Sequence, residues 1–407
     1  MTTTPLHAEN PPEYPIPRKC PYRPASELVD LRKHSPMTKV RLYNGRTAWL
    51  VTDTEAARTV LADHRKVSIS AKVGNFPMLN EEFEAIVDSG FAEVLFGADP
   101  PVHTQQRQMI MPSFTMRRVD RLHSDIQRIV EEKFDEMMSK GNTGDIVAQF
   151  AHPVPSLVIS LLLGVPAEER EEFDEPARRL FSAEPGQAEQ AMTDLNAYLE
   201  KLISHKEANP GAGPVGLVDD LVENQLKGGK VDRATLIQLA LAMLVAGTDT
   251  TTNVISLGTL ALLDNREQWD ALVADPGLVP NAVAEMLRYV SLIEQYGRVA
   301  TEDIDLGGHV IKAGEGILIS SVGVAFDPAT TPDPFRFDIT REPGANIAFG
   351  HGVHRCPGAE LARLELEITF RAMIARMPNL RITIPHDQVP GNNDGTLQRL
   401  FELPVAW

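Results

Sequence analysis

A short loop near the C-terminus places one cysteine among glycines. Residues 349–363 have the sequence Phe-Gly-His-Gly-Val-His-Arg-Cys-Pro-Gly-Ala-Glu-Leu-Ala-Arg, with Cys356 between glycines on both sides. Glycines permit positive φ angles or a close backbone approach. We expect a helix to begin at about Pro357, so that its free N–H groups and positive dipole end face the sulfur. Such surroundings favour a thiolate, the form of cysteine that binds a metal, over a structural thiol.

A second polar stretch interrupts a long apolar segment. A helix is expected over Ala234–Leu263 with Asp232 as its N-cap, and its middle contains Ala-Gly-Thr-Asp-Thr-Thr-Thr-Asn at residues 246–253. Glycine costs roughly 0.5–1 kcal/mol relative to alanine there, and threonine is also a poor helix former. Such a departure is typical of a functional site. Asp249 and Thr250 together can relay protons. Alternatively, the threonine hydroxyls bond back to the preceding helical turn.

Two charged pairs have helical spacing. His103 and Arg107 are four residues apart in a helix expected to open at Pro100-Pro101, so they share one face. In isolation such a pair is usually solvated. Glu285 and Arg288 are three residues apart, and their apolar surroundings indicate burial instead.

The elements that position these residues are mostly helical. Alternating residues around Asn44-Gly45 predict a hairpin over Val40–Val51, followed by a helix from Glu55. Residues 71–97 lack periodicity and are interpreted as a lid or, alternatively, a plain surface loop. The chain is mostly helical from 119 to 239, and small strands are expected over Thr301–Ile319.

Composition excludes several classes of function. The chain has 407 residues, 43% of them apolar, and a net charge of -17, which argues against a nucleic-acid partner. Its two cysteines, Cys20 and Cys356, are not expected to pair, as in a reducing compartment. We see no secretory signal and no apolar run of bilayer length, so we expect a cytoplasmic protein without a membrane contact.

Taken together, the motifs resemble those of the cytochrome P-450 superfamily in its soluble bacterial type. The pattern Phe-Gly-x-Gly-x-x-x-Cys-x-Gly resembles its haem-binding loop, Ala-Gly-x-Asp-Thr-Thr its central-helix motif, and Glu-x-x-Arg and His-x-x-x-Arg two further motifs. The resemblance extends from Pro24 to Trp407. With Arg-Lys-Cys-Pro-Tyr at residues 18–22, it is greatest to the actinobacterial group that hydroxylates polyketides, macrolides and xenobiotics.

The resemblance implies a fold and a set of roles. The fold is mainly α with a smaller β-rich region, in a single domain over residues 1–407 with an irregular arm over 1–24. A long central helix lies over a haem b whose iron is bound by the Cys356 thiolate, and Asp249 and Thr250 are implied to deliver protons. The other implied haem contacts are His103, Arg107, Arg298, His354, Phe349, Gly350, Gly358, Ala246 and Gly247, of which the first four hold the propionates.

Structural and substrate-binding roles follow from the same resemblance. Arg336 is implied as the third member of a structural triad with Glu285 and Arg288. The implied substrate contacts are apolar: Phe76, Leu95, Leu292, Ile293 and Leu397. One departure from the bacterial pattern is Ala325-Phe326, where Asn-Arg is usual.

The implied activity is monooxygenation of a bulky, mostly apolar small molecule by O2. The chain has no Gly-x-Gly-x-x-Gly after a strand, so a monomeric enzyme would receive electrons from a ferredoxin and a ferredoxin reductase. One alternative is a haem-thiolate nitric oxide reductase that uses NAD(P)H directly, although it would not need Asp249-Thr250. Another is a non-catalytic haem gas sensor, which would be expected to have an added signalling domain.

Overall fold

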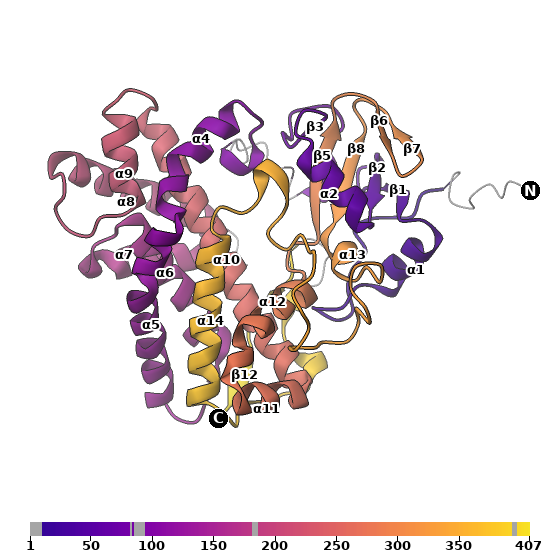
Figure 1. Ribbon diagram of the computed structural model, residues 1–407. Coiled ribbons are helices and arrows are strands. Elements are labelled where there is room, and N and C mark those ends of the chain that lie inside the picture. Colours follow the sequence, from indigo (N-terminus) through magenta and orange to yellow (C-terminus); the bar gives the residue numbers. More distant parts are fainter. Residues whose placement is uncertain (1–9, 82–83, 85–93, 181–185, 393–396) are drawn as a thin grey trace, which may run out of the picture. The chain divides into compact units, whose positions relative to one another are not determined.

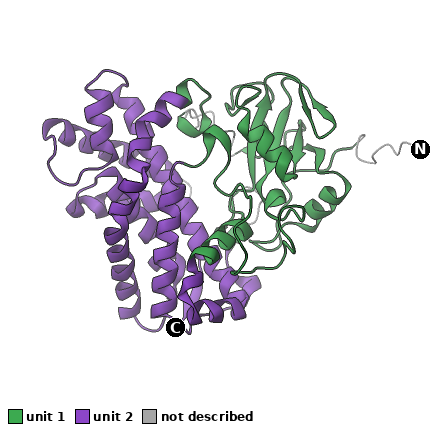
Figure 2. Cartoon of the chain, in the orientation of Figure 1, with its two compact units in different colours: residues 1–103, 280–356, 391–399 green, residues 104–279, 357–390, 400–407 purple. Residues whose placement is uncertain are grey.

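The chain divides into two compact units, shown in Figure 2. The computed structural model describes residues 10–81, 84, 94–180, 186–392 and 397–407. Unit 1 comprises residues 1–103, 280–356 and 391–399, and unit 2 comprises residues 104–279, 357–390 and 400–407. Each unit is described by itself below, and the expectation of a single domain stays a prediction.

Unit 1 is built on a five-stranded sheet. Its strand order is β1 (Met37–Arg41), β2 (Thr47–Val51), β8 (Gly316–Ser320), β5 (Gln295–Ala300) and β3 (Val67–Ser68) (Figure 1). Strands β2 and β8 are parallel, whereas the other neighbours are antiparallel. The hairpin predicted around Asn44-Gly45 is confirmed, and Gly45 has the positive φ of 79° that its turn requires.

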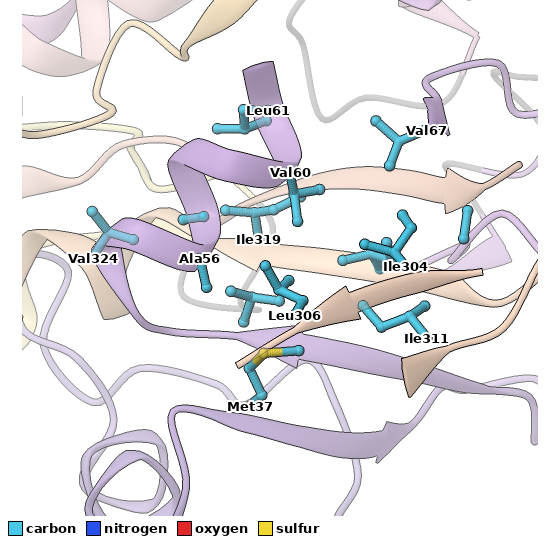
Figure 3. Packing of buried hydrophobic residues seen from close by; sticks show 14 of the residues in the cluster. Met37, Ala56, Val60, Leu61, Val67, Ile304, Leu306, Ile311, Ile319 and Val324 are labelled. Carbon is cyan, nitrogen blue, oxygen red and sulfur yellow. The ribbon is translucent and has the colours of Figure 1, made fainter. Parts of the chain in front are cut away.

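The core of unit 1 lies between this sheet and helix α2 (Thr54–Ala62). The carboxylate of Asp53 caps α2 by accepting from the Ala56 amide at 2.7 Å. One buried cluster contains Val60 of α2, Ile319 of β8 and Ile311 of strand β7 (His309–Ile311), which pairs with β6 (Ile304–Leu306) (Figure 3). Burying each such side chain contributes about 1.5–3 kcal/mol to the stability of the fold. The cluster therefore stabilises the sheet that contains β5 and β8.

The remaining elements of unit 1 surround the sheet. They include α1 (Ser26–His34), the 3-10 turns η2 (Leu95–Gly97) and η8 (Gly352–His354), helix α12 (Val279–Val290), which lies almost wholly in this unit, α13 (Ser321–Ala325) and strand β10 (Gly391–Asn392). Residues 10–24 contain no helix or strand, and Glu13 forms a bridge with Arg41, whereas residues 1–9 of the predicted arm lie outside the described residues. Helix α4 (Val102–Ile110) starts after a cis Pro100-Pro101 bond, and the division between the units falls after its residue His103.

Unit 2 is mainly helical, so the predicted fold class of a mainly α chain with a smaller β region is confirmed. Helix α10 packs against α6, α8 and α14, and α14 also packs against α5 (Figure 1). A small sheet has the order β4 (Thr143–Asp145), β12 (Pro404–Ala406) and β9 (Arg381–Ile382). The helices are α5 (Met116–Ser139), α6 (Pro153–Leu163), α7 (Arg170–Arg179), α8 (Gln187–Ala208), α9 (Leu217–Leu221), α10 (Arg233–Asp264), α11 (Arg266–Ala274) and α14 (Ala359–Arg376).

Helix α10 is the central helix that the sequence predicts. It spans Arg233–Asp264, and the carboxylate of Asp232 accepts from the Thr235 amide at 2.8 Å, so the predicted N-cap is confirmed. Among the described residues it is the one helix long and apolar enough to cross a membrane, which corrects the expectation that no segment would be. In its most apolar window 61% of the residues are buried inside the protein, as in the core helix of a globular fold.

Candidate functional site

The loop that ends at Cys356 is shaped by two glycines. Gly350 and Gly352 have φ angles of 69° and 72°, a region that favours glycine. A Cβ on Gly352 would lie 2.3 Å from the carbonyl oxygen of Leu61, so the loop approaches the end of α2 closely. Gly358 differs, because it has a φ of -86° and occupies the N-cap of α14. The helix therefore begins two residues later than the predicted Pro357.

Two bonds hold this loop in place. The Cys356 amide donates to the carbonyl of Phe349 at 2.8 Å, which closes the loop on itself. The hydroxyl of Tyr296 on β5 donates to the carbonyl of Ile347 at 2.8 Å, which ties the start of the loop to the sheet. Burial raises the pKa of Tyr296, and the charge of Cys356 adds to this effect. Tyr296 was not identified from the sequence, where it is only an aromatic residue in a strand.

Three of the four predicted carboxylate donors belong to unit 1. The rings of His103 and His354 lie 4.0 Å apart between centroids. Arg298 is 4% exposed and donates to the carbonyl of Gly297 at 2.6 Å. Burial lowers the pKa of Arg298 to about 10, while Tyr296 and Asp99 oppose the shift. Arg107 follows His103 by one turn of α4 and belongs to unit 2, so its place beside the other donors stays a prediction.

These donors fit a cofactor that has carboxylate groups. A buried cation is costly unless an anion pairs with it. In the part of unit 1 that the structure describes, no carboxylate lies within ion-pair distance of the Arg298 guanidinium. Cofactor carboxylates would supply the missing anion through charge-assisted hydrogen bonds. The donor set and the nearby cysteine therefore suit a haem with two propionates.

The polar stretch of α10 lies in unit 2. One of its threonine hydroxyls bonds back to the preceding helical turn, which is the alternative that the sequence left open. The Thr250 hydroxyl donates to the carbonyl of Ala246 at 2.7 Å, one turn earlier. Asp249 is 8% exposed, and its carboxylate accepts from the Asn253 side-chain amide at 3.0 Å. Buried hydroxyls on Thr248 and Thr252 find no hydrogen-bond partner among the described residues. The helix thus concentrates polar groups that its own backbone only partly satisfies.

Gly247 makes room for a neighbouring helix. A Cβ there would lie 2.2 Å from Cδ1 of Ile159 on α6, so a larger residue would force the Ile159 side chain to move. This is a reason for glycine that involves no cofactor, whereas the family resemblance implies Gly247 as a haem contact. The preceding residue, Ala246, is exposed within the structure.

A buried cluster that the sequence analysis did not identify surrounds His152, whose pKa depends on Asp249. Burial lowers the pKa of His152, which lies just before α6, and Asp174 and Asp249 oppose that shift. Asp174 accepts from the Ser156 hydroxyl and from the Arg178 guanidinium, the latter at 2.5 Å. The sequence offers no local signal for His152, because its neighbours come from other helices.

A second missed residue is Glu365 on α14. It is 3% exposed, and its Oε1 finds no hydrogen-bond partner in the described part of the chain. Burial raises the pKa of Glu365 to about 8, so the carboxyl group is largely protonated at neutral pH. The sequence signal was an acid flanked by buried apolar positions such as Leu361 and Leu366.

The structural ion pair is confirmed, but its third member is wrong. Arg288 donates to both oxygens of Glu285 at 2.7 Å, and both side chains are buried. The additional arginine is Arg341, whose Nε lies 3.3 Å from Glu285. Arg336, which the sequence analysis had assigned, has a side chain that is 64% exposed and lies 4.0 Å from Asp338 instead. Both arginines lie in one loop, and only the tertiary packing decides which of them turns inward.

The Ala325-Phe326 departure is accommodated by backbone contacts. Arg288 donates to the carbonyl of Ala325 at 2.8 Å, and Arg32 donates to the carbonyl of Phe326 at 3.0 Å. The Phe326 ring lies 5.4 Å from the Arg288 guanidinium, within cation–π range. The main-chain carbonyls of this loop thus accept hydrogen bonds from two arginine side chains.

The predicted substrate residues fall into two groups within unit 1. Ile293 forms an antiparallel bridge with Leu397, and Leu292 is 8% exposed beside them in sequence. Phe76 is 7% exposed, and its ring occupies the space that a Cβ on Gly297 would need. Leu95 is buried at η2. The first group forms a backbone-paired patch, whereas Phe76 is part of a packed core.

Comparisons with known proteins show a clear relationship. The family model described as Cytochrome P450 matches residues 173–400. The chain is 42% identical over 409 residues to a pentalenic acid synthase of Streptomyces avermitilis, covering 100% of both proteins. It is also 42% identical to a vitamin D3 dihydroxylase of Streptomyces griseolus, covering 100% of this chain and 99% of the relative. The crystal structure of cytochrome P450 MoxA from Nonomuraea recticatena matches with a TM-score of 0.91 at 37% identity, covering 97% of this chain and 98% of that one.

Proposed function

The chain belongs to the cytochrome P450 family, and we propose that it inserts one oxygen atom of O2 into a C–H bond of a bulky, mostly apolar small molecule. Its assignment as a P450 monooxygenase rests on full-length relatives at 42% identity. Two of them are named after pentalenic acid and vitamin D3, which supports a small-molecule substrate such as a polyketide, macrolide, terpenoid or drug-like compound. The candidate substrate contacts Leu292, Ile293 and Leu397 are all apolar, which supports a mostly apolar substrate.

The family implies a haem, which we propose to be haem b. When bound, it supplies the activation of O2 that no side chain can perform. Cys356 is the proposed iron ligand, and the Phe349 carbonyl orients its backbone. The proposed carboxylate donors are His103, Arg107, Arg298 and His354, and the proposed contacts with the ring are Phe349, Gly350, Gly358, Ala246 and Gly247.

Asp249 and Thr250 are the proposed proton carriers. The Thr250 oxygen keeps two acceptor lone pairs while it donates to Ala246, so it can accept from a water and then pass on its own proton. The Asn253 amide holds the Asp249 carboxylate in a fixed orientation. A buried carboxylate beside a hydroxyl can thus move protons within a helix that excludes bulk water.

Electrons come from other proteins in this account. The family implies redox partners, and we propose a ferredoxin and a ferredoxin reductase in the cytoplasm, with the enzyme acting as a monomer. A nitric oxide reductase would take electrons from NAD(P)H without a protein partner. A gas sensor would show no turnover with any donor.

The observation that carries the proposal is the buried Arg298, which lacks an acidic partner among the described residues and which, like Cys356, influences the pKa of Tyr296, Arg298 lowering it and Cys356 raising it. The test is turnover of the holoenzyme with a ferredoxin, its reductase and isotopically labelled O2 over a panel of apolar compounds. We expect one labelled oxygen atom in the hydroxylated product, and only with both protein partners present. Label arriving from water, or nitric oxide reduction by NADH alone, would contradict the proposal.

A further inference from the structure

The N-terminal arm contains a buried arginine that contacts the end of helix α12. Arg18 is 3% exposed, and its guanidinium forms an ion pair with the carboxylate of Glu294. It also donates to the carbonyl of Val290 at 3.2 Å and to the carbonyl of Ser291 at 3.0 Å. A planar guanidinium offers five N–H donors in a fixed fork, so it binds an acid and several carbonyls in one geometry that the three donors of a flexible ammonium do not reproduce. Arg18 therefore binds the backbone immediately before Leu292.

The carboxylate of Glu294 extends this contact to a second segment. It accepts from the Gln398 side-chain amide at 2.9 Å, and the Gln398 backbone amide donates to the carbonyl of Leu292 at 3.3 Å. Next to these bonds, Ile293 and Leu397 form their antiparallel bridge. One carboxylate thus joins the arm to the two segments that contain three of the candidate substrate contacts.

The backbone in this region is strained and needs support. Ser291 has a φ of 46°, a left-handed conformation that is unfavourable for a residue other than glycine. Its carbonyl is one of the three that Arg18 binds, with those of Pro21 and Val290, and the Ser291 side chain is 2% exposed. Contacts from Arg18 therefore stabilise a turn that the chain would not adopt by itself.

Other residues of the arm reinforce the same attachment. The Tyr22 ring stacks on Tyr289 of α12 with centroids 5.6 Å apart and an interplanar angle of 30°. The Tyr14 hydroxyl donates to Oε1 of Gln295 at 2.8 Å. These contacts lie on both sides of Arg18 in sequence, so the arm is fixed along its length and not at a single point. Two residues of the Arg-Lys-Cys-Pro-Tyr motif, Arg18 and Tyr22, thus attach the arm to α12 and the turn that follows it.

We propose that Arg18 is a positioning residue for the substrate. By holding Glu294 and the strained turn at Ser291, it sets the position of Leu292–Ile293 and of Leu397 paired with them. The selectivity of the enzyme for bulky ligands then depends on a residue of the arm that touches no ligand. This inference rests on the proposed function, because it takes these three residues as substrate contacts.

The test compares Arg18→Lys with Arg32→Lys in the holoenzyme. Arg32 is a matched control, since it also comes from the N-terminal region, pairs with an acid, Asp327, and donates to a backbone carbonyl, that of Phe326. The lysine keeps the charge in both variants and loses the forked contact. Binding of a small probe, imidazole, and of a bulky one, clotrimazole, is measured from the haem absorption of each protein.

We expect Arg18→Lys to change the ratio of the two dissociation constants by about fivefold or more, and Arg32→Lys to leave the ratio within about twofold of wild type. Hydrogen exchange should become faster over residues 290–298 in Arg18→Lys alone. An unchanged ratio in Arg18→Lys, or an equal change in both variants, would overturn the inference. If Arg18→Lys fails to fold, the neutral pair Arg18→Met with Glu294→Gln is used with the same criteria.

The carbon monoxide spectrum of each reduced protein distinguishes a failure of the proposed function from a failure of the role proposed for Arg18. A wild-type protein without the red-shifted band of a thiolate-bound haem would reject the proposed function and this inference together. A wild-type protein that has this band, combined with an unchanged probe ratio in the Arg18 variant, would reject the inference alone.

Discussion

The Thr250 hydroxyl is proposed to carry protons, and removing it tests that role. We expect Thr250→Ala to retain folding and substrate binding but to release more peroxide per product, because proton delivery to oxygen is lost. The measurement is the ratio of peroxide and hydroxylated product to NADPH consumed in the reconstituted system. A clear fall in coupling is expected, since a positioned proton donor typically contributes at least about 10²-fold.

Thr259→Ala is the matched control for this variant. Thr259 lies on the same helix and donates to the carbonyl of Ile255 at 2.7 Å, the same backward bond that Thr250 makes to Ala246. Losing that bond affects the helix similarly in both variants, but only Thr250 is proposed to carry protons. Equal coupling in the two variants would leave Thr250 with a purely structural role.

Glu365 makes the stability of the protein depend on pH. Its folded pKa of about 8 is raised above the ordinary value of 4.5, so between these values the folded state binds a proton that the unfolded state releases. The group therefore stabilises the fold fully below about pH 4.5 and loses this contribution as pH rises through 8, at about 1.4 kcal/mol per pH unit. Glu365→Gln removes this dependence.

Urea unfolding of both proteins at about pH 5.5 and about pH 7.5 measures the effect. The free energy of unfolding of wild type relative to Glu365→Gln should fall by about 2–3 kcal/mol between the two conditions. Glu367→Gln, two residues along α14 at a partly exposed position, should show no such difference. A parallel pH dependence in wild type and Glu365→Gln would mean that Glu365 titrates normally.

At the residue scale, the sequence was informative wherever a local pattern existed. The glycines around Cys356 and the spacing of Glu285 and Arg288 are visible in short windows, and the buried ion pair was confirmed. Glu365 and Tyr296 were missed because their burial is decided by segments distant in sequence. The substitution of Arg341 for Arg336 in the triad has the same cause.

At the element scale, helix α12 is joined to the loop that leads to Cys356. Besides contacting Glu285, Arg341 donates to the carbonyls of Pro332 at 2.6 Å and Asp333 at 3.1 Å. Glu285 also accepts from the Asp338 amide at 3.0 Å. One arginine and one carboxylate therefore hold this loop against the helix.

Arg341→Met should consequently lower the free energy of unfolding by about 1–3 kcal/mol, because buried acceptors lose their donor. Arg336→Met should change it by no more than about 0.5 kcal/mol, since that side chain is exposed. Denaturant unfolding of both variants gives the comparison. A larger effect from Arg336→Met would restore the assignment made from the sequence.

Helices and strands with a clear hydrophobic pattern were predicted closely. Helix α10 begins and ends within one residue of the predicted limits, because an apolar run with an N-cap defines it locally. The β1–β2 hairpin was equally clear from its Asn-Gly turn. The role of Gly247 was not, since the contact with Ile159 comes from another helix. Local sequence patterns thus predict where helices and hairpins form. The role of a small residue within an element depends on its tertiary contacts.

At the scale of the whole molecule, the motifs are divided between two units. Cys356, His103, Arg298 and His354 belong to unit 1, whereas Asp249 and Thr250 belong to unit 2 (Figure 2). The order of these motifs along the chain was visible in the sequence, and the family relationship extends over the full length. The attachment of the arm through Arg18 was not visible, because its partners lie about 270 residues away.

The central claim is that Cys356 binds a haem iron as a thiolate, and the carbon monoxide difference spectrum of the reduced holoenzyme tests it most directly. We predict the strongly red-shifted Soret band of a thiolate-bound haem in wild type and in the control Cys20→Ser, and loss of that band in Cys356→Ser. A histidine-type band in wild type, or a red-shifted band that survives Cys356→Ser, would contradict the account.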